Sequence, residues 1–220
     1  MTELINHSYK PTFDNIPKEK RERILAVATN EFANNGFENT SIYTIAKKAK
    51  ISVGSLYKYF DSKDDIFITV VHMGLHKLEE LLTELYKKDE DVIIKVERII
   101  REIIYFSRKH PDLIKLYAVV TASKSSPLLV SVAQKMEAIS AQIYTQAILE
   151  GQKTGDVRED IDPAFFAFML DSIFMSLQFS YACDYYKKRY AIYDEEGKFS
   201  SDEFVVEQTL KFIKAAFNFK

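Results

Sequence analysis

The stretch from Thr40 to Lys63 constrains the fold most strongly, because it predicts two short helices joined by a tight turn. It reads TSIYTIAKKAKISVGSLYKYFDSK. Ser41 and Ser52 each stand where a hydroxyl can accept a hydrogen bond from a free N–H group at the start of a helix. Apolar residues follow at helical spacing, so each helix has a face to bury. In the first helix these are Ile42, Ile45, Ala46 and Ala49, and in the second they are Leu56 and Phe60.

The outer face of the second short helix differs from an ordinary solvated face. It is small at its N-terminal end, then hydroxylated and basic, with no acidic residue before Asp61. A helix that enters the major groove of DNA needs a face of this kind, because small residues allow close approach and polar groups can reach base edges. The residues on this face are Val53, Gly54, Ser55, Lys58 and Tyr59.

The composition favours an all-α protein. The 220 residues include only 6 glycines and 5 prolines, and so few helix breakers favour long helices over a β architecture with many turns. The single cysteine, Cys183, excludes an internal disulfide bond and a cysteine-based zinc cluster. The net charge is −2, but residues 1–63 carry ten Lys and Arg against seven Asp and Glu. This distribution suits a small DNA-binding head on an acidic body.

The helical patterns divide the chain into three parts. Residues 1–17 have no periodicity, and we expect them to form a flexible N-terminal arm. Residues 18–62 should form a three-helix DNA-binding head, with the helix-turn-helix at about 41–60. Residues 63–220 should form a larger helical domain for ligand binding and dimerisation, which a long helix joins to the head.

Local signals place the ends of the first and fourth helices. Pro17 opens the first helix, and Gly36 can take the positive φ that ends it. Ser62 and Asp65 form a capping box for the long fourth helix, whose apolar period continues to about Lys88.

Five more helices are expected in the larger domain, at residues 91–109, 113–122, 125–151, 163–189 and 202–219. The helix at 163–189 is apolar almost all round, so it must be covered on every side, by its own core and often by a partner chain. Its richest apolar run is interrupted by Asp171, so the sequence predicts no membrane span. The N-terminus has no apolar core of a signal peptide, which favours a cytoplasmic location.

The motif around the two short helices resembles that of the TetR-type bacterial transcriptional regulators. The family pattern is a glycine-aromatic turn, a Thr-hydrophobic pair before Ile-Ala, a hydrophobic-Ser-x-Gly-x-Leu-Tyr-x-Tyr/His-Phe run, and a lysine at the start of a long helix. The corresponding residues are Gly36-Phe37, Ser41-Ile42 with Ile45-Ala46, Ile51 to Phe60, and Lys63. The resemblance covers roughly Lys18 to Phe67, with Lys50 standing where the family usually has glycine.

The resemblance implies a function as well as a fold. It implies that Ile51 to Phe60 contain the recognition helix and its turn. It also implies a homodimer, joined through helices at about 163–189 and 202–219, that binds a palindromic double-stranded DNA operator. A small effector in a pocket of the body would then move the heads and release DNA. The implied protein is a repressor that is not an enzyme and has no cofactor.

Nine residues are the candidates for DNA contact. Small residues of the second helix would approach base edges, whereas hydroxyl and ammonium groups would bind phosphates. The alternative is that the tyrosines are core aromatics and the lysines form a solvated face. The candidates are Ser41, Ser52, Val53, Gly54, Ser55, Tyr57, Lys58, Tyr59 and Lys63.

A ligand pocket is expected in the body because the chain is rich in aromatic residues, with 13 Tyr and 16 Phe. Such a pocket would take an apolar or aromatic effector. The alternative is that these side chains belong to the ordinary core. The candidate pocket residues are Tyr105, Phe106, Tyr117, Met136, Tyr144, Phe174 and Gln178.

Two histidines allow an alternative function. His72 and His76 are four residues apart, a spacing that can hold a metal and could serve a helical-bundle enzyme. They also lie on the polar stripe of the long helix, and a solvated face without metal is the preferred interpretation. A second alternative is a ligand-binding protein of the same fold without DNA binding.

Overall fold

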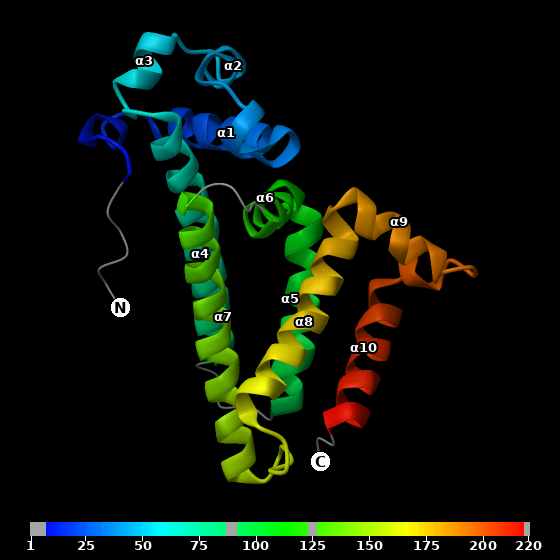
Figure 1. Cartoon of the computed structure of the whole chain (residues 1–220). Coiled ribbons are helices and arrows are strands. Elements are labelled where there is room, and N and C mark those ends of the chain that lie inside the picture. Colours follow the sequence, from blue (N-terminus) through cyan, green and yellow to red (C-terminus); the bar gives the residue numbers. More distant parts are fainter. Residues whose placement is uncertain (1–7, 87–91, 123–126, 218–220) are drawn as a thin grey trace.

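The computed structural model describes residues 8–86, 92–122 and 127–217, and helices dominate all three ranges (Figure 1). The predicted all-α class is confirmed, since no strand occurs in these ranges. The helices are α1 (Lys18–Asn39), α2 (Ile42–Lys48), α3 (Val53–Tyr57), α4 (Lys63–Tyr86), α5 (Val92–Lys109), α6 (Pro111–Ala122), α7 (Pro127–Thr154), α8 (Pro163–Ala182), α9 (Asp184–Ile192) and α10 (Asp202–Phe217). Two short 3-10 turns, η1 (Pro11–Phe13) and η2 (Lys198–Ser200), complete the described elements.

The head is built from α1, α2 and α3 around a buried apolar core (Figure 1). Phe32 of α1, Ile45 of α2 and Leu56 of α3 are almost completely buried in it. Phe67 of α4 enters the same core and meets the ring of Phe32 edge to face, with 5.0 Å between the ring centroids. Each short helix is therefore held by side chains from its neighbours, since helices of five and seven residues are not stable alone.

Gly36 breaks α1 as expected. Its φ of 76° lies in the left-handed region, so the residues up to Asn39 continue the helix only across a kink. The hydroxyl of Thr40 donates to the carbonyl oxygens of Glu31, at 3.0 Å, and Gly36, at 2.8 Å. The chain is thereby turned toward α2.

The expectation of a flexible arm at residues 1–17 is wrong for its second half. Phe13 is 1% exposed and packs against the ring of Phe60, with ring centroids 4.9 Å apart. The backbone N–H of Lys10 donates to the carbonyl oxygen of Tyr59 at 2.7 Å. Residues 8–17 therefore complete the head, because a buried aromatic and a backbone hydrogen bond hold them there. Residues 1–7 lie outside the described residues.

Helix α4 connects the head to the body, as predicted (Figure 1). The backbone N–H of Asp65 donates to the Ser62 hydroxyl at 3.1 Å, and the Asp65 carboxylate accepts from the Ser62 N–H at 3.0 Å. This is the capping box that the sequence indicates. The described helix ends at Tyr86, and residues 87–91, which include the expected end at Lys88, lie outside the described residues.

The expected single helix at 163–189 is two helices. Helix α8 ends at Ala182, and Cys183 has extended backbone angles, φ −94° and ψ 130°, before α9 begins. The sequence contains no glycine or proline at this point to signal the break. Tertiary packing determines where the helix breaks. Phe179 and Ala182 are buried in one cluster with Ile114, and the chain turns away from the core after them.

Helix α8 bears on the expectation that no segment spans a membrane. By length and hydropathy alone it passes as a membrane span, the one such helix in the part of the chain that the structure describes. Phe166, Leu170 and Phe174 of α8 are nevertheless buried in the core of the body. The helix packs against α5, α6 and α7, which is the arrangement of a core helix.

Candidate nucleic-acid interface and ligand cavity

The two short helices have the geometry of a helix-turn-helix. The Ser41 hydroxyl accepts a hydrogen bond from Thr44 N–H at 3.1 Å, and the Ser52 hydroxyl accepts one from Ser55 N–H at 3.0 Å. Lys50 takes the left-handed conformation, with φ 56°, and so replaces the usual glycine of the turn. The Ile51 N–H donates to the carbonyl oxygen of Ala46 at 3.0 Å and closes the turn. Both predicted caps are confirmed.

Gly54 has no role inside the chain that only glycine could fill. Its φ is not positive, and a Cβ added to it would meet nothing within 4 Å. Glycine in a helix costs about 1 kcal/mol relative to alanine. Its neighbours on the outer face, Ser52, Tyr57 and Lys58, are exposed, while Val53 and Ser55 are partly exposed. The outer face of α3 is therefore open and small at its centre.

Tyr59 is not on this face. Its side chain is 7% exposed, and its ring lies 5.5 Å from the ring of Phe13. The ammonium of Lys20 donates to the Tyr59 hydroxyl at 3.1 Å. Tyr59 is a core aromatic, and its assignment as a DNA contact is corrected, because the packed segment 8–17 covers it.

Lys63 is also committed inside the head. Its ammonium donates to the carbonyl oxygens of Phe37, at 2.8 Å, and Glu38, at 3.3 Å, and lies 4.4 Å from the centroid of the Phe37 ring. It binds free carbonyl groups at the end of α1, where a positive charge is favourable. The expected phosphate contact of Lys63 is therefore corrected to a structural one.

Replacing Lys63 by alanine is expected to lower the free energy of unfolding by about 1 kcal/mol, because two carbonyl groups lose a charged donor. Urea denaturation followed by circular dichroism measures the change. Lys47→Ala is the matched control, since Lys47 is exposed on α2 and should leave stability nearly unchanged. Equal stability of the Lys63→Ala variant and the wild type would contradict the structural role.

Tyr43 belongs to the exposed surface of the head, although it is absent from the candidates derived from the sequence. Its side chain is 66% exposed on α2, beside the Ser41 cap. An exposed tyrosine can place a hydroxyl on a phosphate while its ring covers the surface. The available signal was its position between the apolar residues Ile42 and Ile45, which directs it away from the core.

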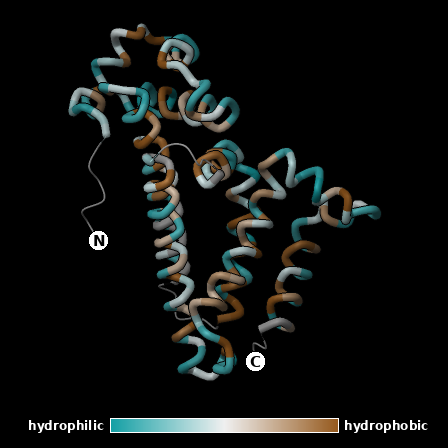
Figure 2. The backbone as a smooth tube through the Cα atoms, in the orientation of Figure 1, coloured by the Kyte–Doolittle hydropathy of each residue, from teal (hydrophilic) through white to brown (hydrophobic). Residues whose placement is uncertain are grey.

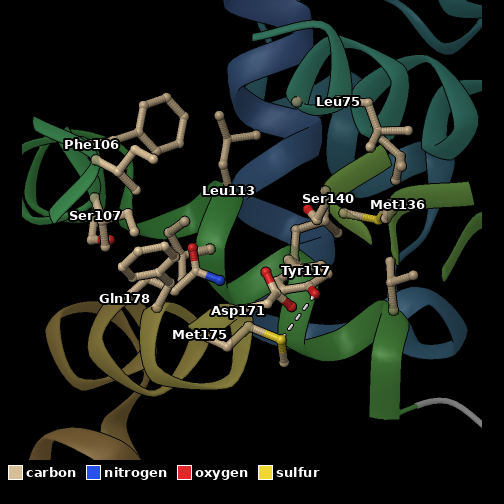
Figure 3. Close-up of a pocket in the computed structure, with 18 of the residues that line it drawn as sticks. Leu75, Phe106, Ser107, Leu113, Tyr117, Met136, Ser140, Asp171, Met175 and Gln178 are labelled. Atoms are coloured by element: carbon tan, nitrogen blue, oxygen red, sulfur yellow. Dashed lines mark hydrogen bonds between the residues drawn. The ribbon is translucent and has the colours of Figure 1, made fainter. Parts of the chain in front are cut away.

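The body contains a cavity of about 110 Å³ between α4, α5, α6, α7 and α8. Apolar and aromatic side chains form most of its wall (Figure 3). Six of the seven residues predicted from the sequence line it, and these are Phe106, Tyr117, Met136, Tyr144, Phe174 and Gln178.

Tyr105 is the exception. It is 56% exposed on α5, and its hydroxyl accepts a hydrogen bond from Lys109 at 2.8 Å. Successive residues of a helix differ by about 100° in direction, so Phe106 and Tyr105 cannot both face the cavity. Tyr105 is corrected to a surface residue.

The wall of the cavity also carries polar groups. Asp171 of α8 lines it, and burial together with the nearby charge of Glu137 raises the pKa of this carboxyl to about 6. The Tyr117 hydroxyl donates to the Glu137 carboxylate at 2.5 Å. Ser107 and Ser140 also line the wall. Asp171, Ser107 and Ser140 were not among the predicted pocket residues, although Asp171 interrupts an apolar helix and so gave a signal in the sequence.

Helix α6 lies between the cavity and the head. Its Leu116 lines the cavity, and the helix packs along α1. Two side-chain hydrogen bonds cross this contact: Asn30 donates to Asp112 at 2.9 Å, and Lys115 donates to Asn34 at 3.1 Å. A change in the shape of the cavity that moves α6 can therefore also move α1.

Comparison with known proteins agrees with this geometry. Residues 24–70, which include the helix-turn-helix, match the family of bacterial regulatory proteins, tetR family. This match places a TetR-type DNA-binding domain at the head of the chain. An uncharacterized HTH-type transcriptional regulator of Bacillus subtilis, YhgD, is 24% identical to it over 163 residues, which are 74% of this chain and 84% of YhgD.

Solved TetR-type structures share the fold over most of the chain. A TetR family transcriptional regulator from Chloroflexus aurantiacus is 22% identical and superposes with a TM-score of 0.69, over 94% of this chain and 97% of that one. The regulator FadR from Bacillus subtilis, in complex with stearoyl-CoA, is 18% identical, with a TM-score of 0.64 over 87% and 96% of the two chains.

The histidines of this TetR-type chain do not form a metal site with other described residues. His72 is half-buried, and its pKa is lowered by burial and by the charge of Lys135. His76 lies 3.2 Å from the Glu80 carboxylate on the exposed side of α4. No group of three His, Cys, Asp or Glu suited to a metal occurs among the residues that the structure describes. The family consists of regulatory proteins, so the enzyme alternative is not favoured.

Apolar side chains are exposed along α8 and α10. Phe168 and Phe165 of α8 and Phe212 of α10 are each at least 60% exposed. A groove between these helices is lined by Ile173, Leu177 and other apolar residues. Figure 2 shows hydrophobic positions along both helices. Exposed aromatic rings in this number are typical of a surface that contacts another molecule.

Proposed function

We propose that this TetR-type regulator is a homodimeric repressor that binds a palindromic operator and is released when a small molecule enters the body cavity. The observation that carries the DNA-binding part is the open, small outer face of α3 centred on Gly54. Gly54 lowers the stability of the helix, and no atom of the chain needs the space beside it. Close approach of DNA to α3 explains why a glycine stands there.

The proposed DNA contacts fall into two groups. Val53, Gly54 and Ser55 would face base edges in the major groove. Hydroxyl and ammonium groups around them would bind phosphates, since both helix starts also present N–H groups there. The proposed phosphate contacts are Ser41, Tyr43, Ser52, Tyr57 and Lys58.

The proposed dimer uses the exposed faces of α8 and α10. Two-fold pairing would bury the exposed rings of both helices against the same helices of the partner. It would also place two α3 helices to read two half-sites, which is why the operator should be palindromic. The predicted dimerisation segments, 163–189 and 202–219, contain both of these faces.

Phe168→Glu is expected to weaken the dimer roughly tenfold or more, because a charged group would replace an interface aromatic. Light scattering coupled to size-exclusion chromatography across a dilution series measures the dissociation constant. Val130→Glu is the control, because Val130 is exposed on α7, away from α10 (Figure 1). A variant with Phe168→Glu that remains as dimeric as the control would rule out the α8 face as the interface.

Release by a ligand would proceed through α4 and α6. Both helices line the cavity, α4 is continuous with the head, and α6 packs on α1. A ligand that binds best to an expanded cavity would shift both helices and change the distance between the two α3 helices. The two α3 helices could then no longer bind both half-sites of the operator at once.

Selection of operators from a random DNA library tests the proposal. The wild-type protein should enrich a two-fold symmetric sequence, and its affinity in mobility-shift assays should fall steeply with salt as phosphate contacts are lost. The DNA flanking its own gene provides a second probe. Failure to retain either DNA at low salt would instead favour a ligand-binding protein that does not bind DNA.

A further inference from the structure

Asp171 has an unusual environment within the cavity. It projects from α8 among Tyr117, Met175 and Gln178 (Figure 3). Its carboxylate makes neither a hydrogen bond nor an ion pair with any other residue that the structure describes. A partly buried carboxylate without a partner is unfavourable, and a positively charged or hydrogen-donating group beside it would stabilise it.

No described side chain of the cavity wall pairs with the Asp171 carboxylate. The described residues that line the cavity include no Lys, Arg or His, and Asp171 is their sole charged member. The Tyr117 hydroxyl is already committed to the Glu137 carboxylate. Glu137 adds a second negative charge near Asp171. This part of the cavity is therefore electronegative.

We propose that the cavity binds apolar molecules that carry a protonated amine, with the ammonium group against Asp171 and the apolar body among the aromatic and aliphatic side chains. The inference rests on the cavity of the proposed function and specifies the chemical class of its occupant. The rings of Tyr117, Tyr144 and Phe174 line the same space and can also stabilise a cation through their faces.

A second polar group of the cavity is also without a partner. Ser107 is 1% exposed, and its hydroxyl has no hydrogen-bond partner in the described part of the chain. It lines the cavity beside Phe106, apart from Asp171 in Figure 3. A buried hydroxyl of this kind is normally satisfied, so it can take a hydrogen bond from the body of a ligand whose ammonium occupies the other end.

The charge of the wall distinguishes this ligand class from anionic ones. A fatty acid carboxylate or a phosphate in the cavity would face Asp171 and Glu137 with no described basic side chain to offset them. Like charges at short range in a medium of low dielectric constant repel strongly. An anion should therefore bind more weakly than an uncharged molecule of the same shape.

Three probes of matched shape test the inference: 4-phenylbutylamine, 4-phenylbutan-1-ol and 4-phenylbutyrate. Their binding to the full-length protein is measured by isothermal titration calorimetry at pH 7.5. We expect the amine to bind about 10- to 100-fold more tightly than the alcohol, as a charged hydrogen bond implies, and the carboxylate to bind most weakly. An alcohol or carboxylate that binds as tightly as the amine would overturn the proposal, and this comparison needs no variant.

Asp171→Asn assigns the preference to one residue. In this variant the amine should lose its advantage over the alcohol, whereas Asp160→Asn, which changes an exposed carboxyl outside the cavity, should retain it. An amine preference that persists in Asp171→Asn would overturn the role of Asp171. Release of operator DNA is measured separately, so a cavity that selects amines without releasing DNA would refute the repressor mechanism and leave this inference standing.

Discussion

Replacing Gly54 by alanine is expected to weaken operator binding by about 10- to 100-fold, because the added methyl group would stand between α3 and the base edges. The same change should leave the protein as stable as the wild type or raise the free energy of unfolding by about 0.5–1 kcal/mol, since alanine favours the helix. No atom of the chain lies within 4 Å of the new Cβ to oppose it. A Gly54→Ala variant that is at least as stable as the wild type but binds operator more weakly would show that Gly54 serves DNA binding and not the fold.

Fluorescence anisotropy with the selected operator measures the affinity, and urea denaturation measures the stability. Gly74→Ala is the matched control: Gly74 lies in α4, far from the α3 face, and its new Cβ would make an ordinary contact with Leu113 at 3.6 Å. That variant should bind operator as the wild type does. If Gly54→Ala also bound with wild-type affinity, α3 would not approach DNA through this face.

Replacing Asp171 by asparagine is expected to raise the free energy of unfolding by about 2 to 3 kcal/mol at pH 8 in the absence of ligand. Burial and the charge of Glu137 raise the pKa of Asp171 from its ordinary 3.8 to about 6 in the folded protein. A pKa that is higher by one in the folded state than in the unfolded state corresponds to about 1.4 kcal/mol. The native state therefore binds this proton more tightly than the unfolded state, and the ionised carboxyl destabilises the fold.

The sign of this effect fixes its pH dependence. Well below pH 3.8 the carboxyl is protonated in both states, so the asparagine variant gains little there. The gain should grow as the pH rises from 4 to 6 and stay constant above that range. Urea denaturation at pH 4, 5, 6 and 8 measures it. Asp160→Asn is the control, because Asp160 is fully exposed and paired with Arg158, which lowers its pKa, so no gain is expected. A gain that fails to rise with pH would contradict the unpaired state of Asp171.

The helix-turn-helix was predictable because its signals are local. The caps by Ser41 and Ser52 depend on residues three positions away, and the turn depends on Lys50 and the hydrogen bond between Ile51 and Ala46 beside it. The assignments of Tyr59 and Lys63 failed for a different reason. Both side chains are engaged by groups more than twenty residues away, Lys20 in one case and Phe37 in the other. Contacts of that separation leave no periodic pattern in the sequence.

The cavity shows the same division. Helical periodicity indicates which face of α5 or α8 is apolar, and six predicted residues do line the space. Periodicity does not show whether an apolar face meets a cavity, a neighbouring helix or a second chain. Asp171 was visible as a polar residue in an apolar run, but only the packing of α6 and α7 around it turns it into part of a cavity wall. The break of α8 at Cys183 likewise depends on its neighbours.

The packing of Phe13 under Tyr59 and Phe60 has a consequence for exchanging DNA-reading modules between regulators. A chimera designed from the helix-turn-helix motif would transplant the residues from α1 onward and leave the preceding segment behind. In such a chimera the end of α3 would lose the packing of Phe13 and the backbone hydrogen bond from Lys10 to Tyr59 that hold it in place. The transferable unit in this protein begins at about residue 8, well before the motif by which it is recognised.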